Sequence, residues 1–129
     1  MYDSPPTNIL LLGVEDPSLT ALTAILSRQN HSVCSIPALP PARALELAGW
    51  LHTDVICCAA EPRLYHPLIE GIRARGAGLP VVAVSSSTDV DEWLDAIQAG
   101  VWDYVSAPLE PDHVNYVVQN ALRCAVPCL

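Results

Sequence analysis

The side chains that could do chemistry are few in this sequence, and they form no recognised catalytic pattern. The serines at residues 85–87 lack the G-x-S-x-G turn that presents a nucleophile at the end of a strand. Gly13 stands without the further glycines of a dinucleotide-binding loop. His52, His66 and His113 fall at expected helix ends or exposed positions, with no partner at a useful spacing. We therefore expect no enzymatic activity.

The five cysteines lack the pattern of a disulfide framework or a metal site. Cys57 and Cys58 are neighbours in a strand-like run, so they point to opposite faces and cannot readily share a pocket or a disulfide. Cys124 and Cys128 offer too few ligands for a zinc site. Together with Cys34, these thiols are expected to be buried or incidental.

The most informative run is residues 54–60, which lies near the middle of the chain. No polar residue interrupts it from Val55 to Ala60, a pattern typical of a strand buried on both faces of a parallel sheet. Ligands usually bind at the carboxyl ends of such strands. Here that end carries Ala59 and Ala60, whose methyl groups can neither hold a metal nor attack a substrate.

Strand and helix patterns alternate five times along the chain. Strand-like runs cover residues 9–14, 32–36, 54–60, 80–85 and 101–105, and helical patterns start near residues 17, 41, 62, 90 and 111. In the fourth helix, Val90, Leu94 and Ile97 are expected to form the inner face. The alternation predicts an α/β fold, a doubly wound (βα)5 three-layer sandwich with helices on both faces of a mostly parallel sheet.

Length and charge limit the classes of protein. The 129 residues suit a single domain, expected at residues 8–124 between a flexible lead-in at 1–7 and a tail at 125–129. No apolar run is long enough to span a bilayer, and the amino terminus does not resemble a signal peptide, so we expect a soluble cytoplasmic protein. The formal charge of −8 disfavours direct contact with nucleic acid or anionic membranes.

One segment identifies a family. Residues 99–109, A-G-V-W-D-Y-V-S-A-P-L, resemble the A-G-A-x-D-Y-L-x-K-P-L/F segment of the receiver domains of bacterial response regulators, which have the CheY-like fold. Residues 54–58 and 79–85 are similar to the third and fourth strands of that family. The resemblance runs from Asn8 to Arg123 and implies a five-stranded parallel sheet of order 2-1-3-4-5.

The resemblance also assigns positions to the residues of the family's phosphorylation site. These are Ala59 for the acceptor aspartate, Ala107 for the lysine, Ser85 for the Thr/Ser switch, Tyr104 for the aromatic switch and Pro108 after a cis bond. The acceptor carboxylate and the cation are therefore expected to be missing. Glu61 is the nearest acid but lies past the strand end, and acceptor geometry tolerates little displacement.

The acidic pair that holds Mg²⁺ in the family is matched in part by Glu15 and Asp16. Aligning Pro17 with the family's proline puts Val14 and Glu15 in the acidic positions, whereas aligning the two acids shortens the following loop by one residue. Either alignment leaves the site incomplete, so Mg²⁺ binding is expected to be weak or absent and no cofactor is predicted. Asp16 as a helix N-cap and Glu15 as a first-turn acid explain both residues without a metal.

These observations favour a pseudo-receiver, a module of two-component signalling that acts through protein–protein interaction without phosphorylation. Its partner is expected to be a signalling protein or a second copy, bound at the fourth helix, fifth strand and fifth helix as in the family. The polar side chains expected to face outward there are Asp91, Glu92, Asp95 and Gln98. Trp93 and Trp102 are expected to supply aromatic anchors.

Two alternatives remain open at this point. One is a ligand or redox sensor that uses the same pocket, with Cys57 and Cys58 nearby. The other, with the least support, is phosphorylation on a displaced acid such as Glu61.

Overall fold

A five-stranded parallel sheet forms the centre of the molecule. The computed structural model describes residues 7–76, 78–87 and 89–125, without the side chains of 124 and 125. The strands are β1 (Thr7–Leu12), β2 (His31–Ile36), β3 (Val55–Ala59), β4 (Val81–Ser85) and β5 (Asp103–Ser106). Their order is β2-β1-β3-β4-β5, with parallel pairing throughout, which confirms the predicted topology.

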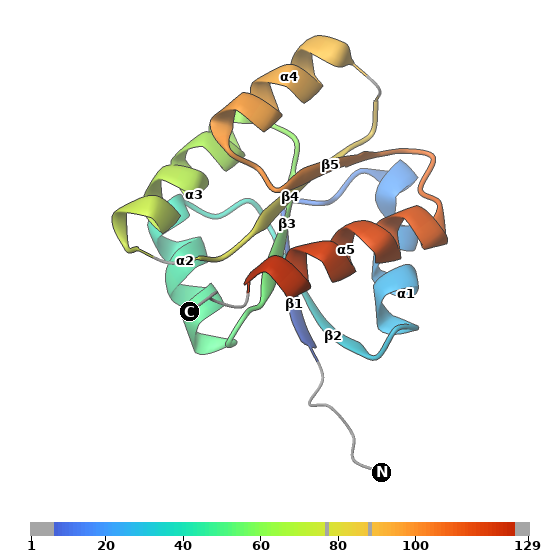
Figure 1. Ribbon diagram of the computed structural model, residues 1–129, viewed down its shortest axis with the longest axis horizontal. Helices are drawn as coiled ribbons and strands as arrows, with labels where there is room; N and C mark the ends of the chain where they lie inside the picture. The colour runs from blue at the N-terminus through green and yellow to red at the C-terminus, as the bar shows by residue number, and fades with distance from the viewer. Residues whose placement is uncertain (1–6, 77, 88, 126–129) are drawn as a thin grey trace.

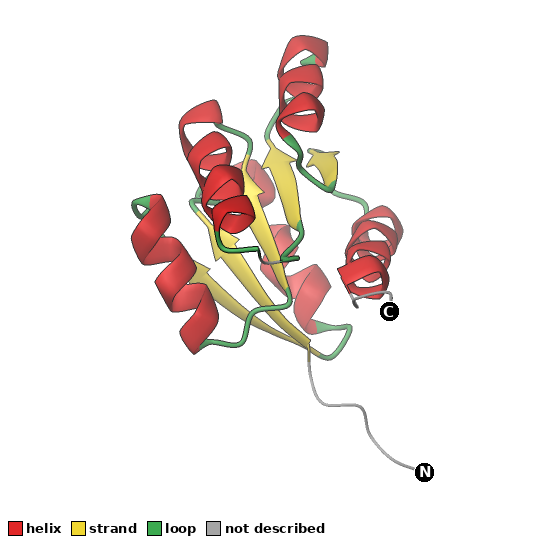
Figure 2. Ribbon diagram, turned by 60° about the vertical axis from the view of Figure 1, so that its left-hand side comes forward, coloured by secondary structure: helices red, strands yellow, loops and turns green. Residues whose placement is uncertain are grey.

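Helices cover both faces of this sheet, as Figures 1 and 2 show. They are α1 (Ala21–Ser27), α2 (Pro41–Trp50), α3 (Pro62–Ala74), α4 (Val90–Ala99) and α5 (Pro111–Ala125). The helices α1 and α5 pack on one face, while α2 and α3 pack on the other and α4 lies beside α3 and β5. The predicted doubly wound (βα)5 sandwich is thus confirmed.

The first helical segment is divided. The sequence predicts one helix from Pro17, but residues Pro17–Leu19 form a single 3-10 turn, and α1 starts only at Ala21. Asp16 caps this turn by accepting a hydrogen bond from the Ser18 amide. A proline at the first position and an acidic cap favour helix initiation, which the tighter turn also satisfies.

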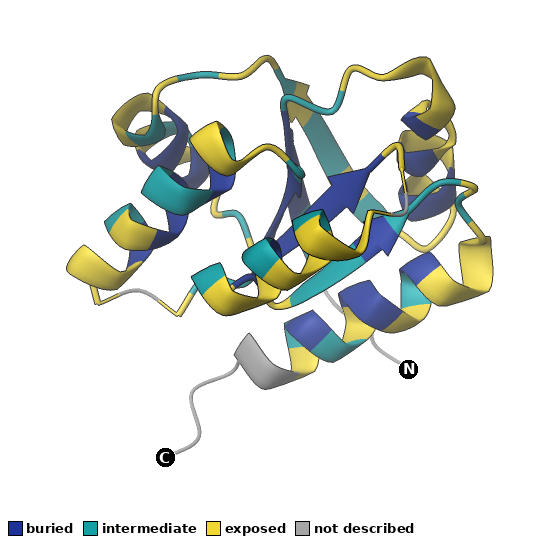
Figure 3. Cartoon of the chain, turned by 90° about the horizontal axis from the view of Figure 1, so that it is seen from above, coloured by how far each residue is buried: buried dark blue, intermediate teal, exposed yellow. Residues whose placement is uncertain are grey.

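The core consists of two apolar clusters, one on each side of the sheet. Successive residues of β3 alternate between them, so that Val55 and Cys57 face α1 and α5 while Ile56 and Cys58 face α2 and α3. All four are almost completely buried. Figure 3 shows the same pattern, with the inner strands of the sheet buried and with helices that are exposed on their outer sides. The two-sided burial predicted for the central strand is confirmed.

The predicted inner face of α4 is wrong. Val90, Leu94 and Ile97 are exposed, and Ala96 is the only buried residue of this fully described helix. Helices turn 100° per residue, so this apolar stripe lies nearly opposite Ala96. The apolar period of these residues indicates a helix but does not determine which side of the helix meets the protein.

The predicted domain limits differ slightly from the structure. Strand β1 begins at Thr7, inside the expected lead-in, and α5 ends at Ala125. Residues 1–6 and 126–129 lie outside the described residues, so the expectations for the two ends stay predictions. Among the described residues, no helix has the length and apolar character needed to cross a membrane.

Gly100 provides the first stability prediction. It ends α4 with φ of +109°, and a Cβ at this position would lie 2.5 Å from Nη2 of Arg73. We expect Gly100→Ala to lower the free energy of unfolding by about 1–2 kcal/mol, because an L side chain is strained in this conformation. Gly49→Ala is the matched control: its Cβ would meet nothing within 4 Å, and we expect a gain of about 0.5–1 kcal/mol in urea unfolding.

His31 provides a second prediction, on pH. Both ring nitrogens are buried without a hydrogen-bond partner among the described residues, and this burial lowers the pKa of His31. The unfolded chain therefore binds a proton more readily than the folded one below about pH 6.5. We expect stability to fall as the pH drops from 7.5 to 5.5.

The His31→Phe variant should lose part of this pH dependence, since phenylalanine keeps an apolar ring and cannot be protonated. His113→Gln, at an exposed position of α5, is the control and should retain the wild-type dependence. Parallel urea unfolding curves for wild type and His31→Phe across this pH range would contradict the assignment.

Candidate functional site

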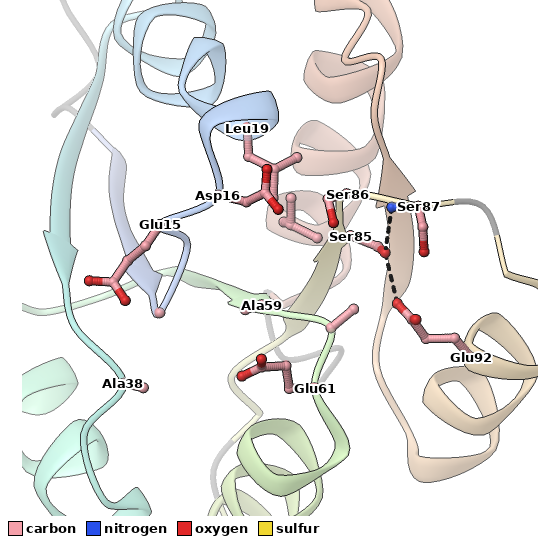
Figure 4. A pocket seen from close by; sticks show the side chains of 13 residues that line it. Glu15, Asp16, Leu19, Ala38, Ala59, Glu61, Ser85, Ser86, Ser87 and Glu92 are labelled. Atoms are coloured by element: carbon pink, nitrogen blue, oxygen red, sulfur yellow. Dashed lines mark hydrogen bonds between the residues drawn. The ribbon is translucent and has the colours of Figure 1, made fainter.

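A pocket of about 450 Å³ lies at the carboxyl ends of β1, β3 and β4. The loops after these strands supply its walls, and Glu92 reaches it from α4 (Figure 4). In a parallel sheet the carboxyl ends of neighbouring strands meet at one edge, which explains why residues distant in sequence converge here. Its polar lining includes Glu15, Asp16, Glu61, Glu92 and the serines at 85–87.

The floor of the pocket carries no functional group at the position that the resemblance assigns to the acceptor. Ala59 is the last residue of β3, opposite Val84 of β4, and its methyl group lines the pocket. Glu61 lines the same pocket from the turn beyond the strand, where it is exposed at the start of α3. The structure thus brings this acid close to the site without placing it at the strand end.

Asp16 has a local structural role. Its Oδ1 accepts hydrogen bonds from the Ser18 amide at 2.9 Å and from the Ser18 hydroxyl at 2.7 Å. The hydroxyl bond, with the amide bond second, lowers the pKa of Asp16. The predicted N-cap is confirmed, whereas Glu15 precedes the cap and is not a first-turn acid.

These residues do not fit the Mg²⁺ ion of the resembling family. The Asp16 carboxylate is engaged by Ser18, and Figure 4 shows the Glu15 carboxylate turned away from Ala59. Mg²⁺ requires several oxygen ligands in near-octahedral geometry. In the part of the chain that the structure describes, no three His, Cys, Asp or Glu residues are grouped as metal ligands.

Glu92 joins the two residues that the resemblance assigns to the switch. Its Oε1 accepts a hydrogen bond from the Ser85 hydroxyl at 2.7 Å and another from the Tyr104 hydroxyl at 2.8 Å. Ser85, which is only 5% exposed, also accepts from the Ser87 amide at 3.1 Å. One carboxylate therefore connects β4, α4 and β5. Burial, together with the adjacent Glu92 carboxylate, raises the pKa of Tyr104 to about 12.

Asp95 connects the same helix to α3. It accepts hydrogen bonds from the Tyr65 hydroxyl and, at 2.8 Å, from Nε2 of His66. The bond from Tyr65, followed by that from His66, lowers the pKa of Asp95. Since Tyr65 is fully buried, its hydroxyl needs such a partner.

The expectation that both acids face outward is therefore wrong for Glu92, which is half-buried, while the Asp95 side chain accepts its two hydrogen bonds and stays 47% exposed. Both acids turn toward hydroxyl donors on neighbouring elements, and these donors come from parts of the chain distant in sequence. Asp91 and Gln98 are exposed as predicted, and Trp93 and Trp102 are each more than 40% exposed. A signal was present, because the three-residue spacing of Glu92 and Asp95 places both acids on the same side of the helix as Ala96.

The segment before Pro108 has the cis bond that the resemblance implies. The bond between Ala107 and Pro108 is cis, and the Ala107 amide donates to the Ser85 carbonyl at 2.9 Å. Ala107 itself packs against the apolar cluster on the α1 and α5 side. A methyl group thus occupies the position that the resemblance assigns to the lysine.

The thiols do not support redox chemistry at this pocket. Cys57 and Cys58 belong to different clusters on opposite faces of the sheet, as predicted from their adjacency. Burial raises the pKa of each thiol to about 12, which disfavours the reactive thiolate. The side chain of Cys124 and the whole of Cys128 lie outside the described residues.

Comparisons with known proteins agree with this fold. No family model matches the chain. The regulatory protein AtoC of Escherichia coli is 29% identical over 86 residues, which cover 62% of this chain and 18% of that protein. The alginate biosynthesis transcriptional regulatory protein AlgB of Pseudomonas aeruginosa is 28% identical over 120 residues, covering 89% of this chain and 26% of AlgB. The chain thus spans about a quarter or less of these relatives.

Solved structures are similar over nearly the whole chain. NtrX from Brucella abortus, in complex with ADP, has a TM-score of 0.77 at 22% identity, with 93% of this chain and 27% of that chain covered. A response regulator from Thermotoga maritima has a TM-score of 0.75 at 18% identity, with 92% and 98% covered. The signal receiver domain of an HD domain-containing protein from Pseudomonas fluorescens has a TM-score of 0.75 at 20% identity, with 97% and 93% covered.

The bonds that Glu92 accepts allow a direct test. We expect Glu92→Gln and Tyr104→Phe each to lower the free energy of unfolding by about 1–2 kcal/mol, since hydrogen bonds to a partly buried carboxylate are stronger than neutral ones. The double variant should cost at least about 0.5 kcal/mol less than the sum of the two, because the residues share one bond. Amide hydrogen exchange should accelerate in α4.

Gln98→Ala is the control, because Gln98 lies exposed on the same helix. Its effect should stay within about 0.5 kcal/mol, as for most surface substitutions. Additive costs of the two Glu92 and Tyr104 substitutions would show that the hydrogen bond between them makes no net contribution.

Proposed function

We propose that this chain, which has the fold of response-regulator receiver domains, is a signalling module that acts through protein–protein contacts without accepting a phosphoryl group. The observation that carries the proposal is Ala59 at the carboxyl end of β3, where it lines the pocket. A methyl group has no lone pair with which to attack phosphorus. The chain is accordingly proposed to have no enzymatic activity of its own.

The surroundings of Ala59 support the same conclusion. Ala107 offers no cation to neutralise the charge that develops during phosphoryl transfer. Glu15, Asp16, Glu61 and Glu92 instead line the pocket with carboxylates, which repel a phosphoryl donor. A displaced reaction on Glu61 would bring an anionic donor into this acidic pocket, so we rank it below the interaction module.

The switch residues already have a partner within the chain. The resemblance assigns Ser85 and Tyr104 to the two switch positions, which in that family respond to a phosphoryl group. Here both hydroxyls donate to Oε1 of Glu92, which is part of α4. We propose that this carboxylate holds β4, α4 and β5 in one arrangement, so that the contact surface exists without an input at the pocket.

The proposed contact surface is formed by α4, β5 and α5. The exposed aromatic and apolar side chains of this region are Val90, Trp93, Leu94, Ile97, Trp102 and Tyr116. Large exposed apolar groups that gather on a helix are typical of interaction sites. The two candidate partners for this surface are a signalling protein and a second copy of the chain, and they differ in the charge that each would bring to it.

The phosphorylation-independent reading is tested with beryllofluoride and Mg²⁺ while backbone amide shifts are followed by NMR. We expect no coherent shifts around Glu15, Ala59 and Ser85 in the wild-type chain, because the acceptor carboxylate is replaced by a methyl group. Acetyl phosphate with Mg²⁺ should likewise leave the intact mass unchanged. Coherent shifts in these three regions, or a mass increase of one phosphoryl group, would refute the proposal.

The matched variant carries Ala59→Asp together with Ala107→Lys, which supply a carboxylate and a cation at the two positions. We expect a larger beryllofluoride response from this variant than from the wild type. A thiol titration with and without oxidant addresses the sensor alternative. Buried Cys57 and Cys58 should react only after unfolding, because burial raises the pKa of both.

A further inference from the structure

The outer side of α4 is an apolar stripe with no partner among the described residues. Val90, Trp93, Leu94 and Ile97 follow the spacing i, i+3, i+4 and i+7, which places them on one face over about two turns. Their exposed fractions range from 38% at Ile97 to 65% at Val90. The opposite side of the helix holds Glu92, Asp95 and Ala96 against the protein.

The orientation of this helix is set by its acids. Turning the apolar stripe inward would break the bonds that Glu92 accepts from Ser85 and Tyr104, and those that Asp95 accepts from Tyr65 and His66. The hydroxyl of Tyr65 would then be left buried without its acceptor, which is unfavourable. The stripe is therefore held outward by the same interactions that hold the helix.

Beside the stripe lies a shallow groove of about 180 Å³, lined by Asp89, Val90, Trp93 and Tyr104. An apolar side chain of a partner could enter it between the Trp93 ring and β5. The groove adjoins the amino-terminal end of α4, where Asp89 caps the helix and Asp91 is exposed. Apolar and anionic groups thus occur together at this end.

Charge distinguishes the candidate occupants. Residues 76–122, which include α4, β5 and most of α5, contain seven acids and no Lys or Arg. A second copy docked through this face would bring the seven acids of each segment toward one another, and the nearest cation at this helix, Arg73 at the carboxyl end of α4, donates to the Ala99 carbonyl. An anionic membrane surface would be repelled for the same reason. A partner with both apolar and cationic side chains complements the apolar stripe and the acids around it.

We propose that the outward stripe of α4 binds a basic amphipathic helix of a partner protein. Leucine-like side chains of the partner lie along Val90, Leu94 and Ile97, and one enters the groove beside Trp93. Lysine or arginine side chains of the partner pair with Asp89 and Asp91. Arg73, which donates to the Ala99 carbonyl at 3.4 Å, marks the other end of α4 and orients the basic side of the partner toward the amino-terminal end. This inference rests on the proposed interaction function and names the partner chemistry.

The test uses three synthetic peptides of 15 residues. The first is an acetylated helix of leucine and lysine with leucines at i, i+3, i+4 and i+7, the second has the same composition in scrambled order, and the third replaces every lysine by glutamate. Binding is followed by Trp fluorescence and by backbone amide shifts of the full chain. With the first peptide we expect amide shifts confined to α4 and β5. The other two peptides should bind at least about tenfold more weakly than the first.

Variants locate the surface. Leu94→Asp and Ile97→Asp should each weaken binding by about tenfold or more, while Asp89→Asn with Asp91→Asn should reduce the salt dependence of binding. The control is Trp50→Ala, because Trp50 is 79% exposed on α2 and should not contribute. Because Leu94 and Ile97 are exposed, both variants should still fold. Unchanged amide signals from the strands of the sheet would verify this independently of binding.

Three results would overturn the inference. They are equal binding of the scrambled peptide, amide shifts centred on α2 or the pocket, and a concentration-dependent dimer in sedimentation that Leu94→Asp abolishes. The last result would identify a second copy as the partner and leave the phosphorylation-independent function intact. A beryllofluoride response, in contrast, would refute that function whatever the peptides do.

Discussion

The structure depends on burying β3 on both faces of a parallel sheet. Its side chains enter both apolar clusters, and its backbone pairs with β1 and β4. Every backbone group of a buried strand needs a hydrogen-bond partner. A shift by one residue would also move each side chain of β3 to the opposite face of the sheet, so the register is fixed. The carboxyl end of β3 is thereby placed at the pocket, where Ala59 is one of the lining residues.

The helix α4 follows a different rule from the other helices. Whereas α3 buries Leu68, Ile69 and Ile72, α4 buries only Ala96 and is joined to neighbouring elements by hydrogen bonds to two carboxylates. Hydrogen bonds from hydroxyl groups to partly buried carboxylates take the place of apolar packing. This arrangement leaves a stripe of apolar side chains exposed on the surface, and it is on this stripe that the proposed partner binding rests.

Much of the site could be read from sequence because its residues sit next to recognisable elements. Ser85 ends an apolar strand, Asp16 precedes a helix-starting proline, and the segment before Pro108 resembles a family in which the bond is cis. Glu92 could not be assigned in the same way. Its partners Ser85 and Tyr104 lie 7 and 12 residues away in sequence, and nothing local indicates that one carboxylate serves both.

The sequence by itself determined the five strand–helix repeats and the burial of residues 54–60, since these follow from local periodicity. It also determined the parallel sheet, because strands joined through helices by short loops pair in parallel. It also determined that Ala59 carries no carboxylate. Only the tertiary structure decided which side of α4 faces the protein. The stripe of Val90, Leu94 and Ile97 has the apolar period of a buried face. The hydroxyl groups of Tyr65, Ser85 and Tyr104 require acceptors, however, and they turn the acidic side of the helix inward.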